Sequence, residues 1–136
     1  MTGKVSMQDL QTINVKGGDV RKGLSVSELS YASFGELYFS EVQHNYIKGW
    51  KMHTRMTCNL IVPIGCVKFV TTLDKVSFAE YFLGRNQYRR LTIPPNVWFA
   101  FQGVESGVNL IANVANIEHE ADEAISADLN KIKYNW

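Results

Sequence analysis

The chain has 136 residues, and 14 lysine and arginine residues against 13 acidic ones leave a formal net charge of +1. We expect this length to form one domain, residues 1–136, and the balanced charge excludes the strongly basic surface that is typical of nucleic-acid binding. No stretch approaches the ~18 apolar residues that a membrane-spanning helix needs, and the first residues lack the apolar core of a signal peptide. We therefore expect a cytoplasmic protein that contacts neither nucleic acid nor membrane.

Short extended segments, separated by turn residues, follow one another along most of the chain. The clearest is 34–43, where Leu37 and Phe39 alternate with Glu36 and Tyr38, as in a strand with two different faces. Expected strands recur about every ten residues, with glycine, Asp-Lys or Pro-Pro-Asn turns between them, which predicts a closed or two-sheet antiparallel β architecture. The expected strands are 10–15, 34–43, 60–64, 66–73, 78–83, 88–93, 98–101 and 108–114.

Residues 117–130 break this pattern. The stretch is acidic and contains several alanines, which is compatible with one or two helical turns or with a loop that crosses the end of a barrel. The last residues, Ile132 to Trp136, end on two aromatic side chains, and we expect them to pack back on the barrel rather than fray.

A cluster of basic and imidazole side chains lies between apolar residues near the middle of the chain. Charged residues on a fully solvated strand would not be interleaved with large apolar side chains, so we interpret the cluster as a site on the inner face of a sheet. The competing interpretation is a strand corner whose basic groups point to water. The cluster consists of Lys48, Lys51, His53 and Arg55, with Trp50, Met52 and Met56 among them.

Several segments in the same order resemble the dTDP-4-dehydrorhamnose 3,5-epimerase family of nucleotide-sugar isomerases, which are cupins. Asp19-Val20-Arg21 is similar to the family's D-x-R, Lys48-Gly49-Trp50 stands in place of its R-G-L, and 91–103 contains L-x-I-P and the aromatic corner. The closing I-x-x-x-W falls at 132–136. The resemblance implies an all-β, cupin-type antiparallel barrel or jelly roll with a short C-terminal helical or loop segment. It also implies a homodimer.

The residues that carry the family's chemistry differ here. The family's catalytic histidine follows R-G-L, and Lys51 stands in that position; the histidine of the aromatic corner falls on Phe99. The family's tyrosine acid falls near 117–118, where the chain has isoleucine and glutamate. The acidic partner of the catalytic histidine aligns with Asp128. These departures argue against the family's usual epimerisation at two carbons of the sugar more than they argue against binding of a nucleotide sugar.

Enolisation beside a ketone needs a base, a donor to the enolate oxygen and an acid. A lysine becomes such a base only when desolvation or neighbouring cations lower its pKa, whereas a histidine titrates near neutrality without tuning. Lys51 and His53 are therefore the two candidate bases, and they share one strand face because they are two residues apart. The related 3,4-ketoisomerases carry H-x-H at these positions. The competing roles are a ligand-binding cation for Lys51 and a structural, hydrogen-bonded imidazole for His53.

Arginine and lysine side chains suit a diphosphate, and tryptophan can stack on a thymine ring, although large aromatic residues in a small barrel more often belong to its core. We expect no metal, because the positions that ligate metal in cupins hold too few imidazole and carboxylate groups, and no cofactor, because the substrate ketone acidifies the adjacent C–H bond.

Four tyrosines, 38, 46, 88 and 134, are candidate acids that the sequence does not distinguish. The expected substrate-binding residues are Arg21, Lys48, Arg55, Trp50 and Trp98; the expected catalytic residues are Lys51, His53 and Asp128.

The sequence thus favours a cofactor-independent isomerase or epimerase that acts on a nucleotide-linked 4-keto-6-deoxy sugar in surface-polysaccharide synthesis. The alternative is a cupin that binds a sugar nucleotide without catalysis, after loss of the family's histidine base and tyrosine acid.

Overall fold

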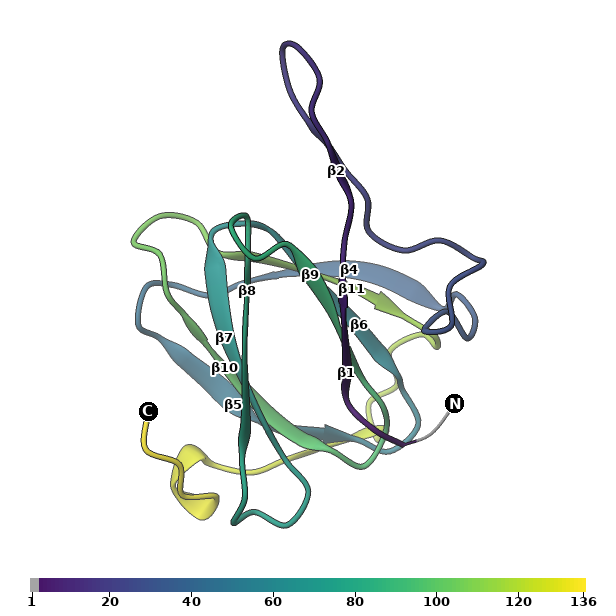
Figure 1. The fold of residues 1–136 in the computed structure, drawn as a ribbon. Coiled ribbons are helices and arrows are strands. Elements are labelled where there is room, and N and C mark those ends of the chain that lie inside the picture. The colour runs from purple at the N-terminus through teal and green to yellow at the C-terminus, as the bar shows by residue number, and fades with distance from the viewer. Residues whose placement is uncertain (1–2) are drawn as a thin grey trace.

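Two antiparallel sheets face each other in the computed structural model, which describes residues 3–136 (Figure 1). The first sheet has the strand order β1-β9-β6-β11-β4 and the second β12-β5-β10-β7-β8, so sequence neighbours repeatedly lie in different sheets. This arrangement confirms the prediction of an all-β cupin-type jelly roll. Within residues 3–136 no helix is long and apolar enough to cross a membrane.

The strands match the expected runs closely, and four more are present: two near the start of the chain, one over the basic cluster and one beside the C-terminus. The bounds of the first sheet are β1 Ser6–Asp9, β4 Glu36–Glu41, β6 Cys58–Ile64, β9 Arg89–Ile93 and β11 Leu110–Ala115. Those of the second are β5 Ile47–His53, β7 Cys66–Thr72, β8 Ala79–Gly84, β10 Trp98–Gly103 and β12 Ala124–Ser126.

A hairpin of β2 (Thr12–Ile13) and β3 (Val20–Arg21) extends away from the barrel as an arm (Figure 1). Its turn contains Gly17 and Gly18, both with positive φ, as the glycine pair predicted. Arg21 lies at the base of the arm, where its guanidinium group donates to Thr12 Oγ1 at 3.2 Å and lies 5.5 Å from the ring centroid of Tyr88.

The main core lies between the two sheets and consists of side chains from both. Strand alternation directs these residues inward, and their burial is the main favourable contribution to folding. The main core contains Val42, Met56, Cys58, Leu60, Val62, Val67, Phe69, Leu83, Leu91, Ile93, Val97, Phe99, Ile111 and Ala115.

A second cluster, here called the outer cluster, covers the other face of the second sheet. It forms because Trp50 and Trp98 alternate with inward-facing neighbours on β5 and β10, and the C-terminal segment packs on them (Figure 1). The predicted return of the C-terminus to the barrel is therefore confirmed. The outer cluster contains Trp50, Val70, Trp98, Ala100 and Ile132, with Met52, Phe78, Ala127, Tyr134 and Trp136 at its edge.

The segment 117–130, for which a helical turn or a loop was expected, contains turns, the three-residue strand β12 and the start of a 3-10 turn, η1 (Leu129–Lys131). β12 pairs with β5 in antiparallel register, with Ala124 opposite His53 and Ser126 opposite Lys51. This pairing places the residues just before β12 beside the end of β5.

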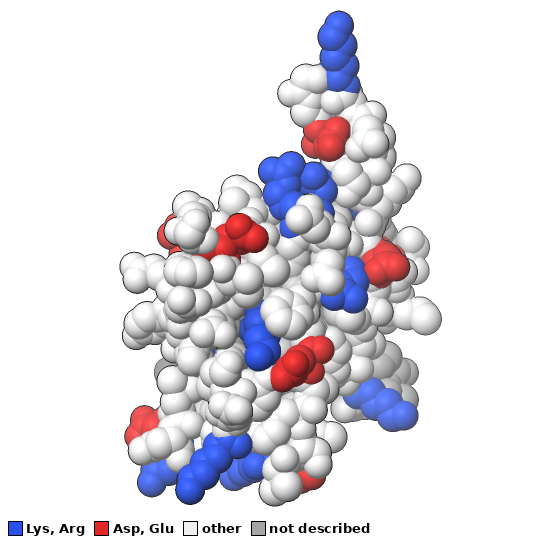
Figure 2. Space-filling view, turned by 60° about the vertical axis from the view of Figure 1, so that its left-hand side comes forward, with Lys and Arg blue, Asp and Glu red and all other residues white. Residues whose placement is uncertain are grey.

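Charged side chains do not gather into a single patch on the face that Figure 2 shows. Lysine and arginine side chains and aspartate and glutamate side chains are both scattered over the barrel there, and basic side-chain atoms lie at the tip of the arm. This distribution agrees with the balanced composition.

Candidate functional site

A cavity of about 320 Å³ opens between the two sheets beside the basic cluster. This volume is within the range of small-molecule sites. Its polar lining comes from both sheets, with Tyr38 and Asn113 on the first sheet and Lys51 and His53 on the second, and aromatic residues close its walls. The lining residues are Tyr38, Ser40, Lys48, Gly49, Trp50, Lys51, His53, Cys58, Leu60, Phe69, Phe99, Phe101, Ile111, Asn113 and Ser126.

His53, at the end of β5, is buried and paired with a carboxylate. Its Nδ1 lies 2.6 Å from Oε1 of Glu123, which is itself completely buried, and its ring stacks on Phe99 with centroids 6.0 Å apart. A carboxylate can only accept, so Nδ1 carries the proton of this hydrogen bond. The other ring nitrogen has no hydrogen-bond partner within residues 3–136 and remains for a ligand in the cavity.

Glu123 is held by backbone groups as well as by His53. Its Oε2 accepts from the amides of Arg55 at 3.0 Å and Met56 at 2.9 Å, and its carbonyl oxygen accepts from the amide and hydroxyl of Thr54. Burial raises the pKa of the Glu123 carboxyl, but the hydrogen bonds from His53 and from these two amides outweigh burial and lower the pKa to about 2. Glu123 is therefore a carboxylate at neutral pH.

Lys48 and Lys51 both border the cavity, but their amines differ in environment. Lys48 Nζ donates to the carbonyl oxygen of Glu41 at 2.6 Å, whereas the amine of Lys51 has neither an ion pair nor a hydrogen bond within the described part of the chain. Gly49 lies on β5 and faces β10, where a Cβ atom at this position would stand 2.2 Å from Ala100 Cβ. Glycine is thus required for the close approach of these strands next to the two lysines.

Tyr38 enters the cavity from β4. Its hydroxyl accepts a hydrogen bond from Asn113 Nδ2 at 2.9 Å and lies 3.9 Å from Met56 Sδ. Burial, followed by the nearby Cys58, raises the pKa of the Tyr38 hydroxyl above its ordinary value. Burial likewise raises the pKa of the Cys58 thiol to about 12, so this cavity-lining cysteine is protonated at neutral pH.

The other predicted site residues do not point their side chains into this arrangement, although Trp50 borders the cavity. The indole of Trp50 packs on Phe78 and Trp136 and that of Trp98 belongs to the outer cluster, so both rings lie on the face of the sheet opposite His53. They were expected to bind substrate inside the barrel. The alternation of residues along a strand does not tell which of its two faces points inward when both faces are covered. Arg21 lies on the arm and is not part of the cavity lining.

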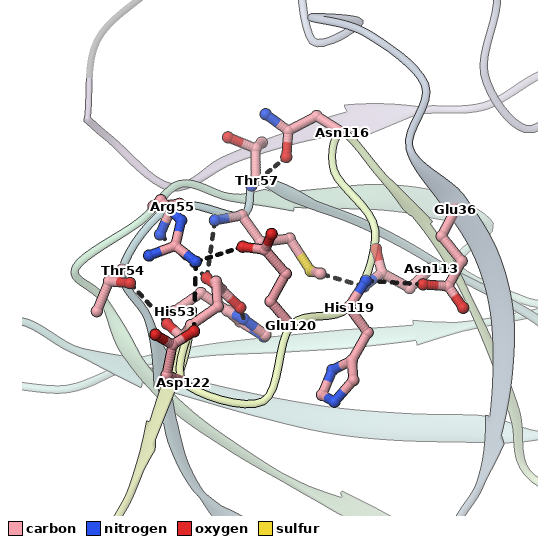
Figure 3. Close-up of polar contacts among 12 residues, drawn as sticks. Glu36, His53, Thr54, Arg55, Thr57, Asn113, Asn116, His119, Glu120 and Asp122 are labelled. Atoms are coloured by element: carbon pink, nitrogen blue, oxygen red, sulfur yellow. Dashed lines mark hydrogen bonds and ion pairs between the residues drawn. The ribbon is translucent and has the colours of Figure 1, made fainter.

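Arg55 is exposed and pairs with Glu120 and, at 3.7 Å, with Asp122 (Figure 3). Asp128 is exposed at the start of η1 and makes no side-chain capping bond, so the acidic partner of His53 is Glu123 rather than Asp128. The missed residue, Glu123, lies in the acidic stretch 117–130. The sequence gives no local signal for its role, because the pairing of β12 with β5, which brings Glu123 beside His53, is visible only in the three-dimensional structure.

Within residues 3–136, no group of three or more histidine, cysteine, aspartate or glutamate side chains is arranged to hold a metal ion. The two cysteines are free thiols.

A jelly roll with a histidine–carboxylate pair, a tyrosine and lysines around one cavity defines a cupin with the groups for proton transfer. No protein-family model and no curated protein matches the chain. A solved structure, the dTDP sugar isomerase from Desulfovibrio desulfuricans G20, is 34% identical with a TM-score of 0.91, covering 97% of this chain and 90% of that one. The chain therefore belongs to the dTDP-sugar isomerase family of cupins, which resemble dTDP-4-dehydrorhamnose 3,5-epimerase.

Two more distant structures share the fold. A sugar 3,4-ketoisomerase from Thermoanaerobacterium thermosaccharolyticum, solved in complex with TDP, is 18% identical with a TM-score of 0.77, covering 92% of this chain and 89% of that one. The dTDP-4-dehydrorhamnose 3,5-epimerase from Sulfolobus tokodaii is 13% identical with a TM-score of 0.81, covering 96% and 80%.

Proposed function

We propose that this protein is a cytoplasmic isomerase or epimerase of a nucleotide-linked 4-keto-6-deoxy sugar, acting in surface-polysaccharide synthesis by removing a proton next to the keto group. The observation that carries this proposal is the buried His53–Glu123 pair on a cavity that Tyr38 and Lys51 also line. The names of the similar structures, which include isomerases, ketoisomerases and epimerases of such sugars, support the substrate class.

His53 is the base in this mechanism. The Glu123 carboxylate holds the proton on Nδ1, so the lone pair of the neutral ring lies on Nε2. Nε2 takes the proton from the carbon beside the ketone, and the imidazolium that forms is stabilised by the adjacent carboxylate. The electron pair of the broken C–H bond moves toward the ketone oxygen, which becomes an enolate.

Lys51 supplies positive charge for that enolate oxygen. Its amine borders the cavity and has no competing ion pair within residues 3–136, so its charge is available to a ligand. A cation that stabilises charge formed only in the transition state lowers the barrier to enolisation. Lys48, next to the same cavity, is the candidate contact for the diphosphate.

Tyr38 is the acid. It stands on the first sheet and His53 on the second, so the two groups approach the cavity from different walls. Return of a proton from a second wall allows inversion of a carbon, whereas return from His53 alone allows transfer between neighbouring carbons without inversion. The reaction needs no cofactor, because the substrate's ketone makes the adjacent C–H bond acidic.

A homodimer accompanies this proposal. The outward side of the edge strand β4 carries Leu37 and Phe39, which are 48% and 61% exposed, and the preceding loop carries Phe34 and Leu29, also exposed. Contiguous exposed apolar side chains mark association surfaces. We assign this face to a second copy of the chain.

The test compares catalysis with binding. The protein is incubated with dTDP-4-keto-6-deoxyglucose in deuterated water and NMR follows the hydrogens at C3 and C5, while calorimetry measures binding of TDP. Deuterium at either carbon, at a rate well above the buffer control, is the expected result. Binding without exchange for this and other 4-keto sugars would instead identify the non-catalytic sugar-nucleotide-binding cupin, whose case rests on Lys51 and Phe99 at the family's histidine positions.

A further inference from the structure

Tyr38 is coupled to a buried amide whose orientation is fixed. Asn113 lies directly opposite Tyr38 in the pairing of β11 with β4 and is only 3% exposed. Its Oδ1 accepts a hydrogen bond from the backbone amide of Asn59 at 3.0 Å, and its Nδ2 donates to the Tyr38 hydroxyl at 2.9 Å. Since a backbone amide can only donate, the contact with Asn59 determines which end of the Asn113 side chain faces Tyr38.

This orientation decides where the hydroxyl hydrogen of Tyr38 can point. The oxygen already accepts from Asn113, so the hydrogen must be directed elsewhere. The other contact of the hydroxyl within residues 3–136 is Met56 Sδ at 3.9 Å, and a thioether sulfur is a weak acceptor. A carbonyl or enolate group in the cavity is a stronger acceptor and would take that hydrogen.

We propose that Asn113 is a positioning residue that makes Tyr38 a proton donor toward the cavity and stabilises the phenolate left behind. The inference rests on the proposed function, in which Tyr38 is the acid. In the step concerned, the O–H bond of Tyr38 breaks as the enolate carbon gains the proton. The electron pair stays on the phenolate oxygen, which the Asn113 amide already contacts.

The surroundings of Tyr38 disfavour a phenolate, so the hydrogen bond donated by Asn113 is needed to stabilise it. Burial opposes a negative charge on Tyr38 most strongly, and the carboxylates of Glu36 on the same strand and Glu123 beside β12 act in the same direction. The Asn113 bond lowers the pKa of the hydroxyl, and the cations on the opposite wall are Lys51 and, when protonated, His53. Without Asn113 the phenolate would face mainly opposing groups.

The first experiment titrates Tyr38 in the ligand-free protein, using phenolate absorbance and subtracting the Tyr38→Phe variant. A hydrogen bond to a charged group is strong enough for Asn113→Leu to raise the pKa of Tyr38 by about one to two units. If the leucine variant does not fold, Asn113→Asp is the second variant, because its carboxylate can still accept the hydrogen bond from the backbone amide of Asn59. The carboxylate would also accept the hydroxyl hydrogen of Tyr38 and so turn it away from the cavity. An unchanged Tyr38 titration in the folded variants would overturn the inference.

Asn116→Asp is the matched control. Asn116 directly follows β11, and its Oδ1 likewise accepts a backbone amide, that of Thr57 at 2.7 Å (Figure 3). The hydroxyl of Tyr38 bonds to Asn113 and Met56 and makes no hydrogen bond to Asn116 within residues 3–136. We expect this variant to leave the Tyr38 titration nearly unchanged, and a shift equal to that of Asn113→Asp would attribute the effect to added charge alone and overturn the inference.

The second experiment measures exchange in the same variants. Asn113→Asp is expected to lower the rate at saturating substrate at least tenfold while TDP binding is retained, because the change affects proton donation rather than binding. A shifted titration with an unchanged exchange rate would overturn the inference and leave the proposed function intact. Absence of exchange in the wild-type protein would overturn the proposed function, whereas the titration would still report whether Asn113 controls Tyr38.

Discussion

The buried carboxylate of Glu123 determines which nitrogen of His53 is free. As a carboxylate it accepts from Nδ1–H, whereas an uncharged amide in its place can donate. Glu123→Gln can keep the backbone contacts through its oxygen and direct its NH₂ group at Nδ1. The ring then carries its proton on Nε2, which removes the lone pair from the cavity.

We predict that Glu123→Gln lowers deuterium exchange by about 10²- to 10⁴-fold, the usual contribution of a positioned acid or base. The nitrogen resonances of His53 in NMR would report the change of tautomer. An exchange rate within a factor of two of wild type, with the protein folded, would contradict the role of the pair.

The low pKa of Glu123 also predicts how stability depends on pH. The folded-state pKa is about 2 and the ordinary value 4.5, so the carboxylate contributes stability above pH 4.5 that is lost as pH falls toward 2. This contribution is of order 3 kcal/mol. Urea unfolding from pH 6 to 3 should therefore show wild type losing free energy of unfolding more steeply than Glu123→Gln. Parallel curves would show that Glu123 has no such role.

At the scale of elements, the C-terminal segment connects the outer cluster to the site. β12 pairs with β5, and the backbone groups of Ala127 and Trp50 exchange hydrogen bonds at 2.8 and 3.0 Å, just after Glu123. Ile132 then anchors the segment by packing among the tryptophans of the outer cluster. A short strand with three residues gains most of its stability from such packing.

Ile132→Ala is predicted to reduce the free energy of unfolding by about 2–4 kcal/mol, because the side chain is almost fully buried and its removal leaves a cavity. Denaturant unfolding measures the change. Ile125→Ala, on β12 but 45% exposed, is the matched control and should cost less than about 1 kcal/mol. Equal losses for the two variants would contradict the anchoring role of Ile132.

The sequence predicted the strands and turns well but not how they assemble. Gly65, Lys75 and Asn96 have positive φ at turns that the sequence marked, and most expected strands agree within a few residues. Local composition encodes these features directly. On β4, however, Tyr38 and not Leu37 or Phe39 faces the cavity, because the cavity end of the interior holds polar groups while the apolar side chains of this edge strand are exposed.

The partner of His53 could not be predicted for a related reason. Glu123 lies 70 residues away in an acidic stretch, and its burial follows from the pairing of β12 with β5 and from two backbone amides after β5. Such long-range contacts leave no local periodicity. The strand face shared by Lys51 and His53, in contrast, follows from their spacing, and both line the cavity.

At the scale of the whole molecule, the apolar outer side of β4 predicts self-association. Phe39→Asp places a charge in the assigned contact, so we expect wild type to sediment as a dimer and the variant as a monomer. Val76→Asp, in an exposed position outside β4, is the control and should sediment like wild type. A monomeric wild type, or a Phe39→Asp protein that still dimerises, would contradict the assignment of this face.

The central claim is that His53 is the base. The most direct measurement is deuterium incorporation at C3 and C5 of dTDP-4-keto-6-deoxyglucose by wild type, His53→Asn and Lys51→Met, with TDP binding measured in parallel. We expect His53→Asn to bind TDP but lose exchange, while Lys51→Met retains slower exchange because the base is still present. Exchange that survives in His53→Asn and disappears in Lys51→Met would contradict the claim and identify the lysine as the base.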